Sequence, residues 1–306
     1  MIEVRELRKA FGETNALDGL SFTVKEGVAF GLLGRNGAGK TTSMRILMNV
    51  FHQDSGTASF DGLPASKSPK RIGYLPEERG LYLKVRIIDQ MVFLGRLRGL
   101  TAARAKEEST ELLKELEASE YKDKKLMTLS KGNQQKIQLA IALLGEPEIV
   151  ILDEPFSGLD PVNARLLKDL VRNQAKKGKT VIFSSHQMAQ VEEFCDDICI
   201  IDRGKDVLSG NLANIKKSYP RNRIVVDPGI GSPPDIKQRL KTALDIEEIK
   251  DRPEGAFEVI LKDPGRRGEL LAALTAMGVV PETFSVQEPS LEEIFVEKVG
   301  RGEEAN

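Results

Sequence analysis

Short apolar runs divide the first two thirds of the chain into alternating strands and helices. Three runs, at residues 28–33, 148–152 and 180–184, are almost entirely aliphatic or β-branched. The first leads through a glycine-rich segment into a helical pattern from Lys40 to about Val50. Strands of this kind between helices are typical of a mostly parallel sheet covered on both faces. The opening stretches IEVREL and LSFTVKEG instead predict short strands joined by turns.

The pattern changes between about residues 81 and 144, where it becomes almost purely helical. The run TAARAKEESTELLKELEA consists mainly of strong helix formers, and Leu112, Leu113 and Leu116 form its apolar stripe. We therefore expect a helical subdomain inserted into the α/β core.

After about Leu212 the pattern changes again. The apolar periodicity predicts the order strand, helix, strand, strand, helix, strand, which is typical of a ferredoxin-like domain. A loop rich in Pro and Gly, at 227–234, separates its first strand and helix. Ser290 and Glu293 form a capping box before a last short helix. We expect an α/β domain over 1–211 and a small α+β domain over 212–306.

Composition narrows the class of protein. Lys and Arg number 45 against 46 Asp and Glu, so no strongly basic surface for nucleic acid is indicated. No window approaches the roughly 20 apolar residues of a membrane-spanning helix, and the N-terminus lacks a signal-peptide core. We therefore expect a cytoplasmic protein. Cys195 and Cys199 are interpreted as small core residues, not as a disulfide or metal site.

The glycine-rich segment fits the phosphate-binding pattern G-x-x-x-x-G-K-[ST], and it lies between a buried strand and a helix as that pattern requires. Its residues are Gly34, Arg35, Asn36, Gly37, Ala38, Gly39, Lys40 and Thr41, followed by Thr42. Glycines let successive backbone N–H groups turn toward phosphate oxygens. Lys40 is predicted to reach the β- and γ-phosphates of ATP, and the Thr41 hydroxyl to ligate Mg²⁺.

The aliphatic run at 149–152 ends in two carboxylates, Asp153 and Glu154. Both are expected at the carboxyl edge of the sheet, where ligands of open α/β folds bind. Asp153 is predicted to hold Mg²⁺ through its water, and Glu154 to act as the general base on the attacking water.

Further motifs follow in a fixed order. Leu129-Ser-Lys-Gly-Asn-Gln-Gln-Lys136 is similar to the ABC signature, Ser157-Gly-Leu-Asp160 to the D-loop, and Ser184-Ser-His186 to the switch-histidine strand end. Together with the phosphate loop and the acidic strand end, they cover about residues 1–210. Over that range the chain resembles ABC ATPases.

The resemblance implies several site residues. Phe11 would stack on adenine, although an ordinary core Phe at a strand end is the alternative. Ser130 and Gly132 would contact the γ-phosphate of ATP on the opposite subunit, and Asp160 belongs to the same ATP site. His186 would contact the γ-phosphate of its own ATP. Each chain would then hold two half-sites, so ATP would close a head-to-tail dimer with a second copy or a homologous ATPase.

Two positions depart from the family pattern. Glu77 stands where Gln is usual, and could bind Mg²⁺ or lie in a surface loop. Lys131 and Asn133 alter the signature. The SKGNQQK form and the ending Glu288-Pro-Ser-Leu-Glu-Glu-Ile-Phe295 resemble bacterial and archaeal exporters of sodium, drugs or cell-surface components.

The resemblance implies an ATP-hydrolysing subunit that powers a separate integral-membrane permease and is attached through it to the inner face of the membrane. Residues 77–86 with Val92, Phe93 and Leu94 are candidates for the permease groove, unless these three form the subdomain's own core. The alternative function is a soluble regulatory or non-transport ABC ATPase.

Overall fold

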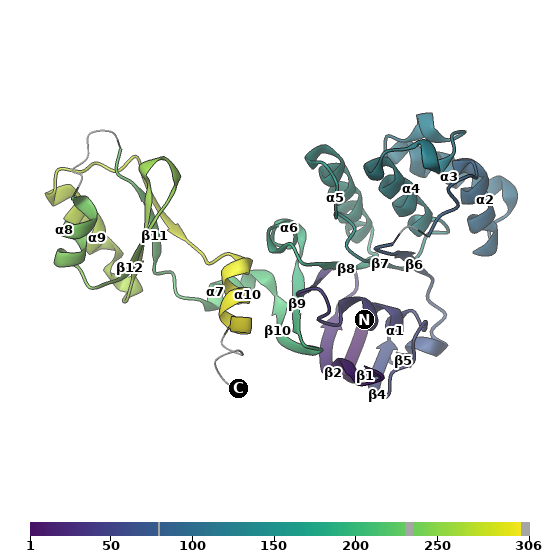
Figure 1. Cartoon of the computed structure of the whole chain (residues 1–306), viewed down its shortest axis with the longest axis horizontal. Coiled ribbons are helices and arrows are strands. Elements are labelled where there is room, and N and C mark those ends of the chain that lie inside the picture. The colour runs from purple at the N-terminus through teal and green to yellow at the C-terminus, as the bar shows by residue number, and fades with distance from the viewer. Residues whose placement is uncertain (79, 230–234, 301–306) are drawn as a thin grey trace. The chain divides into compact units, whose positions relative to one another are not determined.

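Residues 1–78, 80–229 and 235–300 are described by the computed structural model, in which the chain forms two compact units (Figure 1). The first comprises Met1–Leu212 together with the segment from Phe295 onward, and the second Ala213–Ile294. Each unit has a hydrophobic core of its own.

A six-stranded sheet forms the centre of the first unit. Its members are β3 (Ala29–Leu33), β6 (Ile72–Leu75), β7 (Ile149–Leu152), β8 (Thr180–Ser185), β9 (Asp197–Asp202) and β10 (Lys205–Asn211). They lie in the order β10-β9-β3-β8-β7-β6, and only β10 pairs antiparallel with its neighbour. All residues of β3, β7 and β8 are buried, because both faces of this sheet are covered. The expected mixed, mostly parallel sheet is confirmed.

An antiparallel sheet covers one face of the unit's core. Its members are β1 (Ile2–Phe11), β2 (Thr14–Val24), β4 (Ser55–Phe60) and β5 (Leu63–Pro64), in the order β2-β1-β4-β5. β1 and β2 are longer than the sequence pattern predicted, since their pairing continues through polar residues to Phe11 opposite Thr14. The short helix η1 (Ala65–Lys67) follows β5.

Helix α1 (Lys40–Leu47) packs in this core through Met44, Ile46 and Leu47. It ends three residues before the predicted Val50. Asn49 adopts a left-handed conformation with φ 58°, its N–H donates to the Ile46 carbonyl, and the Val50 N–H donates to the Arg45 carbonyl. These bonds satisfy the last carbonyls of the helix and turn the chain away from it.

The opposite face of the six-stranded sheet is covered by α5 (Pro161–Lys176) and α6 (Met188–Phe194). Phe183 of β8 and Phe194 of α6 stack with ring centroids 4.6 Å apart, and Phe156 meets both rings edge-on.

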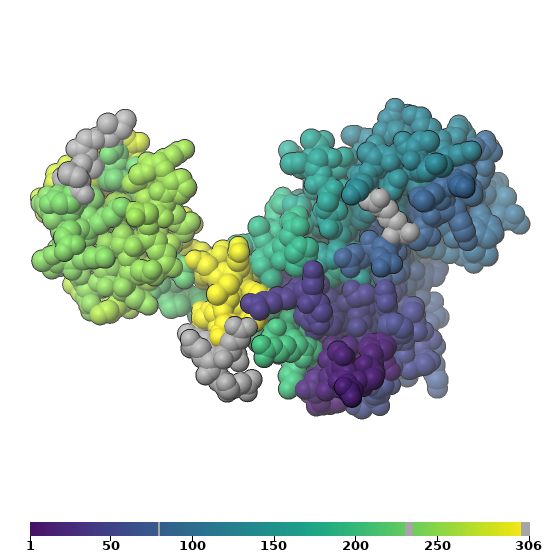
Figure 2. All heavy atoms as spheres, in the orientation of Figure 1, coloured from purple at the N-terminus to yellow at the C-terminus, as the bar shows by residue number. Residues whose placement is uncertain are grey.

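The helical insertion contains α2 (Ile87–Leu97), α3 (Ala102–Glu115), η2 (Ser119–Tyr121), η3 (Leu126–Thr128) and α4 (Lys131–Leu143). Figure 2 shows its blue and teal residues as a lobe above the purple residues of the N-terminal part. Thr101 caps α3 by accepting from the Arg104 N–H, and Leu112, Leu113 and Leu116 are buried as the apolar stripe predicted.

The second unit has the predicted order of strands and helices. After α7 (Leu212–Ser218) come β11 (Arg223–Asp227), α8 (Ile236–Ala243), β12 (Ile246–Asp251), η4 (Pro253–Gly255), β13 (Phe257–Leu261), η5 (Pro264–Arg266), α9 (Arg267–Ala276) and β14 (Thr283–Gln287). Helix α10 (Leu291–Gly300) begins in this unit, and its residues from Phe295 belong to the first. The antiparallel strand order β12-β13-β11-β14 confirms the ferredoxin-like fold.

The end of this unit carries the predicted capping box. The Ser290 N–H donates to Glu293 Oε2 at 2.9 Å, and the Glu293 N–H donates to Ser290 Oγ at 3.2 Å. In the predicted loop at 227–234, residues 230–234 lie outside the described part of the chain.

The two cysteines are free thiols. Cys199 belongs to the core as expected, whereas Cys195 is half-buried, and burial raises the pKa of both thiols. Among the described residues, none of the helices combines the length and apolar character needed to span a bilayer.

Candidate nucleotide site

The phosphate loop joins the buried strand β3 to the N-terminus of α1. Gly37 and Gly39 have φ values of 82° and 112°, which L side chains rarely adopt. A Cβ atom on Gly39 would also lie 2.6 Å from the carbonyl oxygen of Ala16. Gly39 caps α1 without a side chain, so the first N–H groups of the helix are available to an anion.

A cleft of about 480 Å³ lies over this loop. It is lined by Thr14, Asn15, Ala16, Arg35, Asn36, Gly37, Ala38, Gly39, Lys40, Thr41, Thr42, Glu77, Asp153 and Glu154. The fold thus brings together β2, the phosphate loop, the segment after β6 and the carboxyl end of β7, as expected for a ligand site of an open α/β sheet. Gly34 lies at the start of the loop, behind this surface.

Lys40 is held within the loop that it follows. Its side chain is 6% exposed, and its ammonium donates to the Gly34 carbonyl at 2.7 Å and the Arg35 carbonyl at 3.2 Å. Its Nζ also lies 3.6 Å from Glu154 Oε1. The ammonium is therefore positioned beside the place where phosphate oxygens would enter.

Asp153 is almost completely buried at 1% exposure. Its Oδ1 accepts from the Ser184 hydroxyl at 2.6 Å, whereas its Oδ2 has no hydrogen-bond partner among the described residues. A buried carboxylate oxygen without a partner is costly unless a cation or water completes it. Asp153, Thr41 and Glu77 all line the cleft, so oxygen donors suited to Mg²⁺ are present.

Glu154 follows Asp153 and has a left-handed backbone conformation, with φ 49°. This turn of the backbone points the side chains of the two residues in different directions. Its N–H donates to Ser184 Oγ at 2.9 Å, and Nδ1 of His186 lies 3.0 Å from its Oε1. Ser184 therefore anchors both acidic residues, which the sequence motif alone did not indicate. His186 does not line the cleft, but its ring lies against Glu154, which does.

Glu77 lies in an exposed bend after β6 and lines the cleft. Nearby, burial and then the charge of Asp153 raise the pKa of the Tyr74 hydroxyl. The cleft thus has three carboxylates opposite one buried ammonium.

Phe11 lies at the rim. It pairs with Thr14, which lines the cleft, while its own ring is 44% exposed and meets Phe51 edge-on at 5.3 Å. The ring is thus accessible, unlike an ordinary core Phe. Thr14, Asn15 and Ala16 line the cleft but were not predicted, because they belong to no motif and are brought there by the β1–β2 turn.

The signature and D-loop residues lie outside this cleft. Ser130 caps α4 by accepting from the Asn133 N–H, and Gly132 is so close to Asn163 that a Cβ would meet Nδ2 at 3.0 Å. Asp160 caps α5, and hydrogen bonds, first from the Asn163 backbone, lower the pKa of its carboxyl.

The helical lobe exposes several large apolar side chains. They are Tyr82, Leu83, Val85, Phe93, Leu97 and Met127. Val92 and Leu94 are half-buried, whereas the core-facing residues of α2 are Ile87, Ile88 and Met91. Phe93 is therefore not part of the subdomain's core.

Fold and site together define a P-loop nucleotide-binding cassette. The model of the family "ABC transporter" matches residues 17–157, and that of "ATP-binding protein DrrA1-3-like, C-terminal domain" matches residues 210–299. The chain belongs to the ABC transporter ATP-binding proteins, a family whose cassettes hydrolyse ATP.

Individual relatives cover nearly the whole chain. The uncharacterized ABC transporter ATP-binding protein YhaQ of Bacillus subtilis is 41% identical over 98% of this chain and 99% of its own. The Nod factor export ATP-binding protein I of Ralstonia nicotianae is 30% identical over 98% and 94%. A solved ATP-binding subunit of an ABC transporter is 29% identical with a TM-score of 0.65, over 71% of this chain and 92% of its own. The predicted family and fold are confirmed.

Proposed function

We propose that this protein hydrolyses ATP to power export through a separate membrane permease. The proposal rests on the way in which the ATP-binding motifs are distributed over one chain. The phosphate loop, Glu77, Asp153 and Glu154 line one cleft, while Ser130 and Gly132 lie outside it. The full-length similarity to a Nod factor export protein favours export. We assign residues 1–211 to the ATPase domain and 212–306 to an accessory domain.

Binding of the triphosphate would rearrange the buried charges of the cleft. Lys40 lies between the loop carbonyls and Glu154, so an entering γ-phosphate would replace the carboxylate as its counter-ion. Released from Lys40, Glu154 would orient the attacking water and accept its proton. His186, at 3.0 Å from Glu154, would then donate to the γ-phosphate.

Mg²⁺, when bound, would neutralise charge developing on the phosphates. Thr41 and the free Oδ2 of Asp153 would hold it, together with Glu77. Few protein ligands suffice, because Mg²⁺ usually retains waters and binds substrate phosphates.

A second copy of the chain, or a homologous ATPase, would complete each site with its own Ser130, Gly132 and Asp160. The N-terminus of α4, capped by Ser130, would present its free N–H groups to the γ-phosphate across the interface. ATP would therefore close the dimer, and hydrolysis would open it.

The exposed apolar side chains of the helical lobe would receive the permease. Phe93 and Leu97, four residues apart on α2, are 51% and 69% exposed. Docking there would attach the protein peripherally to the inner face of the membrane.

The test is reconstitution with a candidate membrane permease, taken from a neighbouring gene where one encodes such a protein. We expect the pair to copurify, and inside-out vesicles containing it to accumulate sodium or an amphipathic dye only with ATP and Mg²⁺. A Phe93→Ser, Leu97→Ser variant should lose copurification but still bind ATP. ATP hydrolysis without copurification or accumulation would instead support a regulatory, non-transport ATPase.

Changing Glu77 to Gln is expected to weaken metal binding. Removing one of three carboxylates from the cleft lowers its attraction for a divalent cation, and raises the Mg²⁺ concentration at half-maximal hydrolysis by about tenfold. The measurement is ATPase rate against Mg²⁺ concentration at saturating ATP. Glu13→Gln, an exposed turn variant, is the control. An unchanged midpoint for Glu77→Gln would show that this carboxylate does not hold the metal.

A further inference from the structure

Two buried glutamines of α4 contact segments that carry carboxylates of the nucleotide cleft. Gln135 and Gln138 are three residues apart, so they lie on the same face of the helix. Their side chains are 8% and 3% exposed. Neither residue lines the cleft. Both therefore act on it through the backbone of other residues.

Gln135 holds the turn that follows Glu154. Its Nε2 donates to the buried carbonyl oxygen of Pro155 at 3.1 Å. The Nε2 of Gln138 donates to the carbonyl oxygen of Glu78 at 3.5 Å, at the limit of a hydrogen bond. The Gln135 bond is thus the stronger of the two, and it lies next to the residue proposed as the general base.

The backbone of Glu154 depends on such support. Its φ of 49° lies in the left-handed region, which residues other than glycine rarely adopt. A conformation of this kind persists only where the surroundings determine it. Before it, the Glu154 N–H donates to Ser184 Oγ at 2.9 Å, and after it, Gln135 holds the carbonyl of Pro155. The strained residue is therefore anchored by a side chain on each side.

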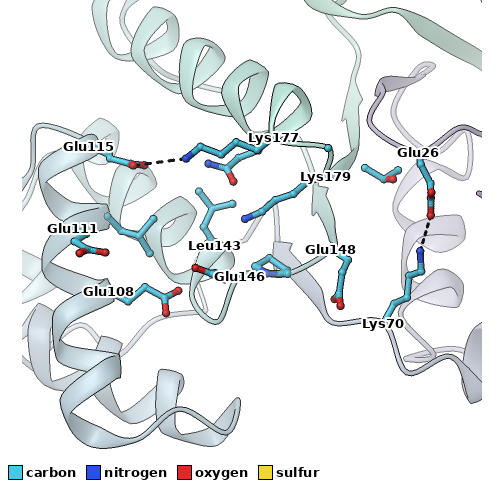
Figure 3. Close-up of a pocket in the computed structure, with 15 residues that line it drawn as sticks. Glu26, Lys70, Glu108, Glu111, Glu115, Leu143, Glu146, Glu148, Lys177 and Lys179 are labelled. Atoms are coloured by element: carbon cyan, nitrogen blue, oxygen red, sulfur yellow. Dashed lines mark hydrogen bonds and ion pairs between the residues drawn. The ribbon is translucent and has the colours of Figure 1, made fainter.

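The far end of α4 is fixed by its neighbours. Arg98 Nη1 donates to the carbonyl oxygen of Leu144, directly after the helix, at 2.8 Å. Glu108 of α3 accepts from the Gly145 N–H at 2.6 Å. Figure 3 shows this end of the helix, where Glu108 and Leu143 both line a cavity of about 570 Å³. The helix is thus a firmly held support for the amides on its buried face.

We propose that Gln135 is a positioning residue for the general base. Its amide fixes the Pro155 carbonyl and, through it, the direction in which the Glu154 carboxylate points. This role presupposes the proposed function, in which Glu154 accepts a proton from the attacking water. The same helix begins at the cap Ser130, which would face the ATP of a second copy. Gln135 thereby links the base of a chain to the half-site that this chain supplies to its partner.

The first experiment uses Gln135→Met, which keeps the length of the side chain but has no N–H donor. We expect the maximal ATPase rate to fall about tenfold, because a small displacement of a catalytic group loses its orientation. The affinity for a fluorescent ATP analogue should stay unchanged, since Gln135 does not line the cleft. Gln90→Met is the matched control. Gln90 is also buried in the helical lobe, at 2% exposure, but its amide donates to the Val85 carbonyl, so this variant should hydrolyse ATP normally.

A double-mutant cycle with Glu154→Gln separates positioning of the base from a structural role. If Gln135 acts through the base, adding Gln135→Met to Glu154→Gln should slow the residual turnover no further. The doubly altered chain should also still dimerise with ATP, because its signature half-site is intact. A further loss of turnover, a loss of dimerisation, or an unchanged rate for Gln135→Met alone would overturn the proposal.

Thermal unfolding checks that each variant is folded. If Gln135→Met does not fold, Gln135→Asn replaces it, because the shorter side chain withdraws the amide from Pro155, and the same outcomes decide. A normal rate in Glu154→Gln alone would contradict the proposed base, and with it this role of Gln135. A normal rate in Gln135→Met, beside a slow Glu154→Gln, contradicts the role of Gln135 and leaves the proposed function in place.

Discussion

The Glu154→Gln variant is expected to hydrolyse ATP roughly a thousandfold more slowly than the unaltered chain. The amide keeps the shape of the side chain but cannot accept a proton from water. It also removes a buried negative charge 3.6 Å from Lys40, so ATP no longer competes with that carboxylate. ATP should therefore bind at least as tightly and hold the chain as a dimer.

Single-turnover phosphate release and size-exclusion chromatography with ATP measure the two effects. Glu247→Gln, an exposed change on β12, is the control and should behave as the unaltered chain. If Glu154→Gln dimers turned over ATP at the normal rate, the general base would have to be another group.

Replacing Lys40 with Met is expected to weaken ATP binding by about tenfold to a hundredfold and to abolish turnover. The ammonium is the one buried cation next to the phosphate loop among the described lining residues. Without this ammonium, the buried Glu154 carboxylate has His186 as its one basic neighbour among the described residues. Its uncompensated negative charge repels an entering phosphate.

Equilibrium binding of a fluorescent ATP analogue checks this expectation, with thermal unfolding as a control for folding. Lys114→Met, on the exposed face of α3, should bind the analogue normally. Retained affinity in a folded Lys40→Met protein would show that the loop amides alone hold the triphosphate.

Local patterns predicted much of the fold. The continuous apolar runs of β3, β7 and β8 indicated a covered parallel sheet, and all three are buried. The antiparallel sheet was only partly predicted, since β4 is rich in Ser, Gly and Thr and depends on pairing with β1, and β5 has only two residues, which pair with β4. The end of α1 was missed because Asn49 stops the helix through backbone hydrogen bonds, not through a break in apolar periodicity.

The motifs likewise predicted most of the residues that line the nucleotide cleft, but not their interactions. No spacing rule indicates that Ser184 anchors Asp153, or that His186 lies against Glu154.

The sequence by itself determined the family, the order of strands and helices, and the chemistry of the phosphate loop, because each depends on neighbours in the chain. Only the tertiary structure decided which oxygen of Asp153 stays free and how Lys40 and Glu154 neutralise each other. Those properties depend on distances of a few ångströms between remote segments. Burial makes them energetically important, since unpaired polar groups are costly only where water cannot reach them.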